Sequence, residues 1–382
     1  MTVSVFFYVQ HLLGIGHLAR ASRIARAMID SGMNVTLVTG GLPVQGFPGP
    51  GIHHIALPPI AVADGAFAGL VDANGQPADT AYLEARKNQL LTAYHTAKPD
   101  IVLIEAFPFG RRQVRFELMP LIDAIEATQP RPALVTSLRD ILQRRSKPGR
   151  DEETVALIRR AFDLVLVHGD PSFAALADSF ALADQIADKT TYTGLVCPPA
   201  PPQPSDQFDV LVSAGGGGAG KHLITAAVGA ARLLPDLAKW CIITGPNLPQ
   251  TDYDVLSQNL PRNVTLTRFR SDLASLMRGA RLSVSQAGYN TVADILIAGC
   301  HALLVPYAVD GETEQTDRAA LLENIGRTRT LRESDLTAAS LATAIKQEIA
   351  RPLPIRSLQI AINGAARSAE ILLALAKSRA QN

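Results

Sequence analysis

The sequence of 382 residues has few cysteines, few aromatic residues, almost no net charge and no long hydrophobic run. Its three cysteines lie far apart without Cys-x-x-Cys spacing, which argues against a disulfide framework or a zinc site and favours a reducing compartment. A formal charge of +1 supplies no overall field for nucleic acid, so no nucleic-acid partner is expected. No apolar run reaches the ~18 residues that a membrane span needs.

What the sequence has in quantity is hydrophobic residues, 47% of the chain, which is the composition of a globular protein with large cores. At ~150 residues per domain, the length predicts two domains. The amino terminus, MTVSVFFYVQ, has the pattern of a β-strand and lacks the features of a signal peptide. We therefore expect a cytoplasmic protein, peripheral at most to the inner face of a membrane.

Short apolar runs alternate with helical stretches along both halves of the chain. Continuous apolar strands are typical of parallel sheets that helices cover on both faces. Five prolines between Pro198 and Pro204 predict an extended connector, because proline neither donates to a sheet nor continues a helix. The predicted α/β fold has two doubly wound, Rossmann-like domains, with a first domain at 1–196, a linker at 197–207, a second domain at 208–357 and a C-terminal helix within 358–382 that packs back on the first domain.

Ligands of doubly wound sheets bind beyond the carboxyl ends of the strands, so the loops there are the candidate sites. The first strand leads into Gly14-Ile15-Gly16-His17 and a helix, and Glu105 ends another strand of that domain. A carboxylate can fix the tautomer of a histidine and stabilise its imidazolium, which makes His17 and Glu105 a candidate general base and its partner. Two alternatives remain: His17 caps or packs against the helix, and Glu105 pairs with Arg111 or Arg112.

The second domain opens with a strand and a glycine-rich loop that reaches Lys221. His222 stands where a nucleotide-hydrolysing phosphate loop needs a magnesium-binding Ser or Thr, so an NTPase is disfavoured. The backbone amides of the loop can still hold a diphosphate. A second anion site is predicted at Gly288, because Asn290 or Thr291 can cap the helix that follows.

Other polar residues follow the later strands of this domain. Asp294 can reach ribose hydroxyls, or it can simply favour the dipole of its helix. Glu314 and Gln315 supply neighbouring donors and acceptors that suit the hydroxyls of a sugar. Asp252 and Asp254 form a nominal Asp-x-Asp pair, but they open a helix, so no metal site is expected.

The run SVSQAGYNTVADILIAG, followed by ALLVPY and EQTDRAALLENIG, resembles GT-B glycosyltransferases, particularly the family 28 group that includes the peptidoglycan GlcNAc transferases. The resemblance covers about 210–326 and extends weakly to the Gly-x-Gly-His turn. It implies the GT-B fold, in which two Rossmann-like domains face each other across a cleft. The C-terminal domain would hold a nucleotide-sugar donor, with a UDP-sugar as the first expectation, and the N-terminal domain would hold the acceptor.

The resemblance also implies roles for residues at matched positions. On the donor side these are Gly217, Gly218, Lys221, Gly288, Asn290 and Thr291 for the diphosphate, Asp294 for the ribose, Phe269 and Arg270 for the base, and Glu314 and Gln315 for the sugar. On the acceptor side they are His17 as base or phosphate contact and Glu105 as its acidic partner, with Gly14, Gly16, Arg111 and Arg112 nearby. Asp294 departs from the family, which commonly has the longer glutamate there.

The function predicted from these features is inverting, metal-independent transfer of a sugar from a nucleoside diphosphate sugar to a hydroxyl acceptor, lipid-linked or a glycan, without a cofactor. A nucleotide-sugar hydrolase is one alternative, since some share a Gly-x-Gly-His turn followed by an arginine, here Arg20. A non-catalytic nucleotide-sugar-binding subunit is another. Basic residues between positions 139 and 150 form either a solvated loop or a contact with lipid phosphates. The sequence predicts no oligomeric state.

Overall fold

The computed structural model describes residues 2–12, 16–44, 46–62, 69–144, 148–215, 220–352 and 360–381. The chain divides into two compact units, unit 1 with 1–196 and 360–382, and unit 2 with 197–359. The chain therefore enters unit 2 at the proline-rich segment and returns to unit 1 for its last helix. That helix begins at Gly364, later than the expected residue 358, and the intervening positions 353–359 lie outside the described residues.

Unit 1 is built on a seven-stranded sheet in the order β3-β2-β1-β6-β7-β8-β9, and every neighbouring pair is parallel. The central strands are continuously buried, as in the five apolar residues that end SVFFYV, because helices cover both faces. The strands are β1 (Ser4–Val9), β2 (Asn34–Thr39), β3 (His53–Ala56), β6 (Ile101–Glu105), β7 (Ala133–Arg139), β8 (Leu164–His168) and β9 (Thr190–Tyr192). A separate antiparallel hairpin joins β4 (Ala61–Val62) to β5 (Leu70–Val71).

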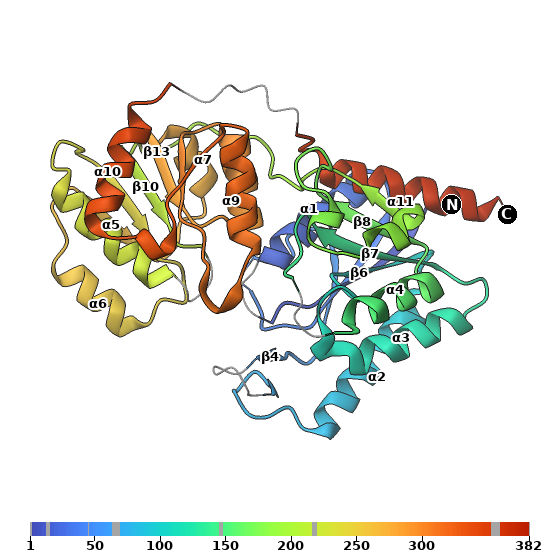
Figure 1. The fold of residues 1–382 in the computed structure, drawn as a ribbon. Helices are drawn as coiled ribbons and strands as arrows, with labels where there is room; N and C mark the ends of the chain where they lie inside the picture. The colour runs from blue at the N-terminus through green and yellow to red at the C-terminus, as the bar shows by residue number, and fades with distance from the viewer. Residues whose placement is uncertain are drawn as a thin grey trace. The chain divides into compact units, whose positions relative to one another are not determined.

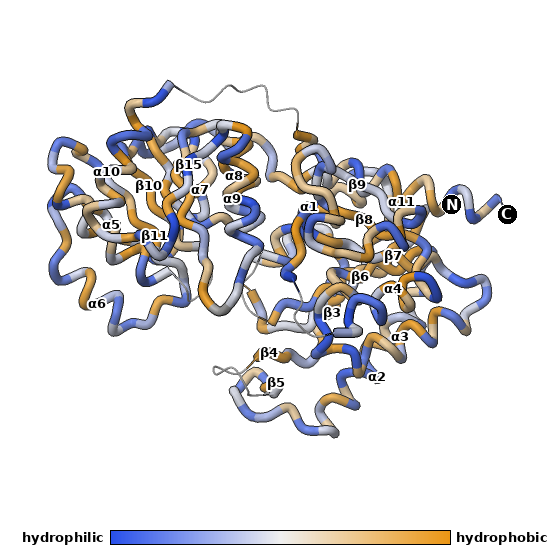
Figure 2. The backbone as a smooth tube through the Cα atoms, viewed as in Figure 1, coloured by the Kyte–Doolittle hydropathy of each residue, from blue (hydrophilic) through white to orange (hydrophobic). Residues whose placement is uncertain are grey.

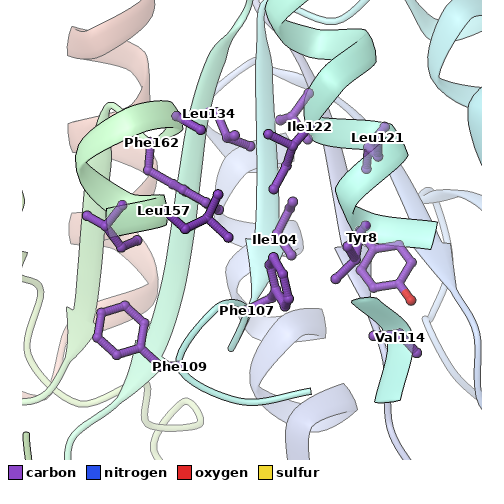
Figure 3. Packing of buried hydrophobic residues seen from close by; sticks show 14 of the residues in the cluster. Tyr8, Ile104, Phe107, Phe109, Val114, Leu121, Ile122, Leu134, Leu157 and Phe162 are labelled. Carbon is purple, nitrogen blue, oxygen red and sulfur yellow. The ribbon is translucent and has the colours of Figure 1, made fainter. Parts of the chain in front are cut away.

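Two hydrophobic layers sandwich this sheet. On one face, Phe6 and Tyr8 of β1 pack with α2, α3 and α4, and Figure 3 shows Tyr8, Leu121 and Ile122 in this layer. On the other face, Phe7 packs with α1 and α11, which also contact each other (Figure 1). The helices are α1 (Gly16–Asp30), α2 (Thr80–Ala97), α3 (Arg115–Ala127), α4 (Arg150–Ala161) and α11 (Gly364–Ala380).

Unit 2 has a six-stranded parallel sheet in the order β12-β11-β10-β13-β14-β15. Its strands are β10 (Val210–Ser213), β11 (Trp240–Ile243), β12 (Val264–Thr267), β13 (Leu282–Ser285), β14 (Ala302–Leu304) and β15 (Arg329–Thr330). Its helices are α5 (Lys221–Leu233), α6 (Gln250–Gln258), α7 (Leu273–Gly279), α8 (Tyr289–Ala298), α9 (Glu314–Asn324) and α10 (Ala338–Ile349). The hydrophobic strands of each unit lie between its helices in Figure 2, and α5 and α10 cover one face of this sheet.

Both units are parallel α/β sheets with helical crossovers, which confirms the predicted fold class. Within the described ranges, no helix is both long enough and apolar enough to cross a membrane.

Candidate functional site

In unit 1 the structure brings His17 and Glu105 into contact. His17 lies in the first turn of α1, directly after β1, and Glu105 is the last residue of β6. Strands β1 and β6 are parallel neighbours, so the helix that follows one strand begins beside the end of the other. The Nδ1 atom of His17 lies 2.9 Å from both carboxylate oxygens of Glu105.

Arg20 completes this contact from the next turn of α1. Its Nη2 donates to Oε1 of Glu105 and lies 3.3 Å from Nδ1 of His17. Because an ionised carboxylate only accepts hydrogen bonds, Nδ1 of His17 carries the proton, and Nε2 is left as the basic nitrogen. The His17 side chain is 21% exposed and that of Glu105 only 1%, so the imidazole can meet a ligand while its partner stays buried.

Burial, helped by two nearby arginines, keeps the imidazole neutral. Burial lowers the pKa of His17 to about 4. The carboxylate of Glu105 raises this pKa, and the positive charges of Arg111 and Arg20 offset part of that rise. Burial alone would raise the pKa of Glu105, but His17, Arg20 and Arg111 together hold it well below its usual range. At neutral pH the pair is thus a carboxylate and an uncharged imidazole, the state a general base requires.

Neither of the alternative partners expected for Glu105, Arg111 and Arg112, forms a direct ion pair with it among the described residues. Arg112 forms an ion pair with Glu153 at 2.7 Å, on the exposed side of the loop. Arg111 acts on Glu105 through its charge, but the carboxylate makes its direct ion pairs with His17 and Arg20. Of the two glycines expected nearby, Gly16 is the first residue of α1, and Gly14 lies outside the described residues.

Sequence reasoning missed His168, the last residue of β8, which lies near this group. It is fully buried, and its ring nitrogens lie 2.7 Å from Oγ of Ser137 and 2.9 Å from Oγ1 of Thr193. Burial lowers the pKa of His168 to about 3, with Arg20 adding to the effect. His168 is therefore a neutral histidine that braces the end of β8 through two hydroxyl groups.

In unit 2 the corresponding sheet edge gathers the glycine-rich loop and the Gly288 turn. Ser213 and Ser285 end the neighbouring strands β10 and β13 and are paired in register. A Cβ on Gly215 would come within 3.6 Å of Oε1 of Gln286, so the start of the loop contacts the start of the turn. Gly217 and Gly218, the predicted diphosphate contacts, lie outside the described residues.

The turn before α8 contains the residues of the predicted second anion site. Gly288 is the residue that precedes the helix, and among the described residues a Cβ there would meet nothing closer than Oγ1 of Thr291 at 4.0 Å. Asn290, Thr291 and Asp294 all belong to α8, whose N-terminus begins at Tyr289. A helix N-terminus favours an anion.

Two residues of α9, Gln315 and Arg318, hold this turn through hydrogen bonds to Ala287. Oε1 of Gln315 accepts hydrogen bonds from the backbone N–H groups of Ala287 (3.0 Å) and Tyr307 (3.2 Å). Arg318 is completely buried and donates to the carbonyl of Ala287 and to Oε1 of Glu314, each at 2.9 Å. Glu314 and Gln315, predicted to contact the sugar, therefore both take part in contacts that fix the turn.

The other predicted donor contacts also have protein partners. Arg270 makes two hydrogen bonds of 2.7 Å to Asp272 and one of 3.0 Å to Asp206. Phe269 beside it is 63% exposed. Lys221, the first residue of α5, pairs with Asp252 at 2.7 Å. In the part of the chain that the structure describes, no three His, Cys, Asp or Glu side chains gather as metal ligands.

Comparison with known proteins bears directly on this second unit, since a family profile matches residues 210–370, most of unit 2 and the start of α11. Residues 210–370 match the profile of the glycosyltransferase family 28 C-terminal domain. The matched range includes the Gly288 turn and α9.

Curated relatives support the same assignment. The N-acetylglucosamine transferase of Phenylobacterium zucineum, which acts on N-acetylmuramyl-(pentapeptide) pyrophosphoryl-undecaprenol with UDP-N-acetylglucosamine, is 28% identical over 48% of this chain. The enzyme of the same name from Agrobacterium fabrum is 26% identical over 52% of this chain. The chain spans about half the length of these relatives, 52% and 56%.

Solved structures resemble the whole chain, beyond the family 28 domain. A calicheamicin glycosyltransferase matches 99% of this chain and 96% of its own with a TM-score of 0.62 at 17% identity. MurG of Acinetobacter baumannii matches 97% of this chain and 99% of its own with a TM-score of 0.59 at 16% identity. Both units together therefore have the GT-B fold of these glycosyltransferases.

Proposed function

We propose that the protein is a metal-independent, inverting glycosyltransferase that moves a sugar from a nucleoside diphosphate sugar to the hydroxyl group of an acceptor. The observation that carries the proposal is the neutral imidazole of His17, oriented by Glu105, in a chain that also contains a family 28 domain. The relatives named for UDP-N-acetylglucosamine favour a UDP-sugar as the donor and a lipid-linked acceptor.

In the proposed reaction, Nε2 of His17 takes the proton of the acceptor hydroxyl while its oxygen attacks the anomeric carbon. The bond from that carbon to the diphosphate breaks, and the diphosphate leaves with the electron pair from the opposite side, which inverts the configuration. Glu105 stabilises the imidazolium that forms, as the carboxylate of a catalytic triad does. Such a base contributes ~10²–10⁴ to the rate.

The departing diphosphate needs separate stabilisation, which we assign to unit 2. We assign it to the backbone N–H groups at the N-terminus of α8, which begins directly after Gly288, because helix N-termini favour negative charge. Gln315 and Arg318 keep these groups in place by holding Ala287 at both its N–H and its carbonyl. Phe269 offers an exposed ring on which a base can stack.

A two-step experiment tests the proposal. A thermal-shift panel of UDP-, GDP- and dTDP-sugars identifies the donor, because a ligand at ~100 times its dissociation constant stabilises by ~2.7 kcal/mol. The chosen donor is then incubated with the protein, with and without acceptors and EDTA, and the products are followed by NMR. Transfer with inversion and without loss in EDTA supports the proposal. Free sugar released at the same rate without acceptor would identify a hydrolase instead.

A further inference from the structure

Arg111 stands out at the carboxyl edge of the unit 1 sheet because its guanidinium makes no hydrogen bond and no direct ion pair within the described ranges. The residue is partly buried, and its Nε is inaccessible to water without an acceptor. A buried donor is normally paired, since leaving it unsatisfied costs free energy. The other arginines nearby have partners: Arg20 has Glu105 and Arg112 has Glu153.

The loop that carries Arg111 is firmly anchored on both sides. Before it, the hydroxyl of Thr136 donates to the carbonyl of Phe107 at 2.6 Å, and Phe109 packs edge-on against Phe180 with ring centroids 5.1 Å apart. After it, Val114 is completely buried. Figure 3 shows the rings of Phe107 and Phe109 and the side chain of Val114 in the hydrophobic cluster. The position of Arg111 is thus set by the fold.

The backbone at Arg111 is itself unusual. Its φ of 59° is left-handed, a region that residues other than glycine rarely adopt and that is over-represented at binding and active sites. The loop begins at Glu105 and turns tightly, with the N–H of Gly110 donating to the carbonyl of Ala106 at 2.7 Å. The chain therefore holds an unpaired guanidinium in a strained conformation a few residues from the carboxylate that orients His17.

The electrostatics place Arg111 in the same group of charges as His17. Burial lowers the pKa of Arg111, the positive charges of Arg139 and Arg20 lower it further, and Glu105 opposes them. Glu105 is thus the carboxylate that acts on Arg111, against the positive charges of Arg20 and Arg139.

We infer that Arg111 binds an anionic substituent of the acceptor, a phosphate or a carboxylate, and so selects acceptors that carry such a group near the reacting hydroxyl. The guanidinium matches the geometry of both anions through two parallel hydrogen bonds. This inference rests on the proposed function, because it takes the His17 side of unit 1 as the acceptor site. It adds a substrate class and a specificity-determining residue to that site.

The test compares Arg111→Gln with the control Arg115→Gln. The control removes the same charge from an exposed arginine, whose Nη1 forms a long ion pair of 3.8 Å with Oε2 of Glu153. The full chain is titrated with inorganic phosphate and, separately, with acetate, with UDP at saturation to fill the donor site. Binding is followed by calorimetry and by the ¹⁵N NMR signals of the His17 ring. We expect the phosphate dissociation constant to rise at least ~10-fold in Arg111→Gln, as a lost charged contact predicts, and to stay within ~2-fold in Arg115→Gln.

Several outcomes overturn the inference. Equal phosphate affinity in Arg111→Gln and the unchanged protein removes Arg111 from the site. A phosphate response that UDP abolishes would assign the anion to the donor. A lower unfolding temperature in Arg111→Gln, with no recovery of binding in Arg111→Lys, would indicate a structural role; we expect an equal or higher unfolding temperature, because an unpaired charge is removed.

A turnover measurement separates this inference from the proposed function. Once transfer is observed, a methyl glucoside is compared with the matching glucuronide and 6-phosphate as acceptors. We expect kcat/KM to be higher for the charged acceptors, and we expect Arg111→Gln to remove that preference by lowering kcat/KM much more for the charged acceptors than for the neutral one. A preference that survives Arg111→Gln contradicts the inference but leaves the glycosyltransferase proposal intact. Failure of all nucleotide sugars to bind contradicts the proposed function, while the phosphate titration still decides the role of Arg111.

Discussion

At the scale of single residues, the account depends on a histidine whose basicity is set by its neighbours. Burial and two arginines make the His17 imidazole a weaker base than a free histidine, and Glu105 partly restores it. A weak base stays unprotonated at neutral pH. When the imidazole takes up a proton, the carboxylate of Glu105 stabilises the imidazolium that forms. The same arrangement predicts the pH dependence of the reaction.

We expect kcat/KM to fall on the acid side with a midpoint near the pKa of His17, about 4, because only the neutral imidazole accepts a proton. Glu105 raises this pKa, so Glu105→Gln moves the midpoint to lower pH and also lowers the plateau. Arg111 lowers it, so Arg111→Gln moves the midpoint to higher pH. A pH–rate profile of the three proteins checks these directions. A midpoint near 6.5 that ignores both substitutions contradicts the described environment of His17.

The contact between His17 and Glu105 could be predicted because it follows from topology. Residues at the ends of neighbouring parallel strands meet at one edge of the sheet, whatever the details of packing. Arg20 carried a readable signal too, since it lies three residues after His17 and therefore on the same side of the helix. The unpaired state of Arg111 could not be predicted, because it depends on which of two adjacent arginines turns toward Glu153.

At the scale of elements, α9 holds the turn before α8 through Gln315 and Arg318. The ion pair of Glu314 with Arg318 spans one helical turn, a spacing that was visible in the sequence. The burial of this ion pair beside Ala287 could not be predicted, because a sequence does not show which side of a polar helix start faces inward. Glu314 and Gln315 were predicted to contact the donor sugar, and the structure adds that they help to position the turn before α8.

Arg318→Met should weaken binding of the nucleoside diphosphate ~10-fold, because the carbonyl of Ala287 loses its donor and the turn before α8 loosens. It should also destabilise unit 2 by ~3–5 kcal/mol, since the buried carboxylate of Glu314 loses its ion pair with Arg318. The double variant Glu314→Gln with Arg318→Met removes that charge, so we expect stability to recover while the weaker affinity persists. Calorimetric titration and thermal unfolding measure the two effects. Affinity that recovers together with stability would contradict a positioning role.

The edge strands mark the limit of what sequence patterns predict about elements. Central strands such as β1 and β6 have five consecutive buried residues and were recognisable as runs. The edge strands β9 and β15 have three and two residues, none of them fully buried, which are too few to establish a pattern. The order of strands in each sheet likewise depends on packing between distant segments.

At the scale of the whole molecule, the last helix ties the end of the chain to unit 1. Ala369 and Leu372 of α11 are completely buried in the layer that also contains Leu18 and Ile24 of α1. The family profile extends to residue 370, into α11, although the structure groups this helix with unit 1. Sequence patterns predicted a terminal helix long enough to return, but its start was placed too early.

Leu372→Ala should destabilise unit 1 by ~2–5 kcal/mol through the cavity it leaves beside α1. The single tryptophan, Trp240, is buried in β11 and reports on unit 2 alone. We therefore expect the circular dichroism transition to move to lower denaturant while the Trp240 fluorescence transition stays in place. Leu341→Ala, at a buried position of α10, should move the fluorescence transition instead. Equal shifts of both signals in Leu372→Ala would place α11 outside unit 1.

In the proposed reaction, unit 1 accepts the proton and unit 2 binds the diphosphate. A variant of His17 tests this division of roles most directly. The measurement is the rate of sugar transfer by His17→Ala, together with its affinity for the nucleoside diphosphate, against His53→Ala as an exposed histidine control. We predict a kcat reduced ~10²–10⁴-fold in His17→Ala, with unchanged nucleotide affinity and an unaffected control. Transfer at the full rate in His17→Ala would contradict the account.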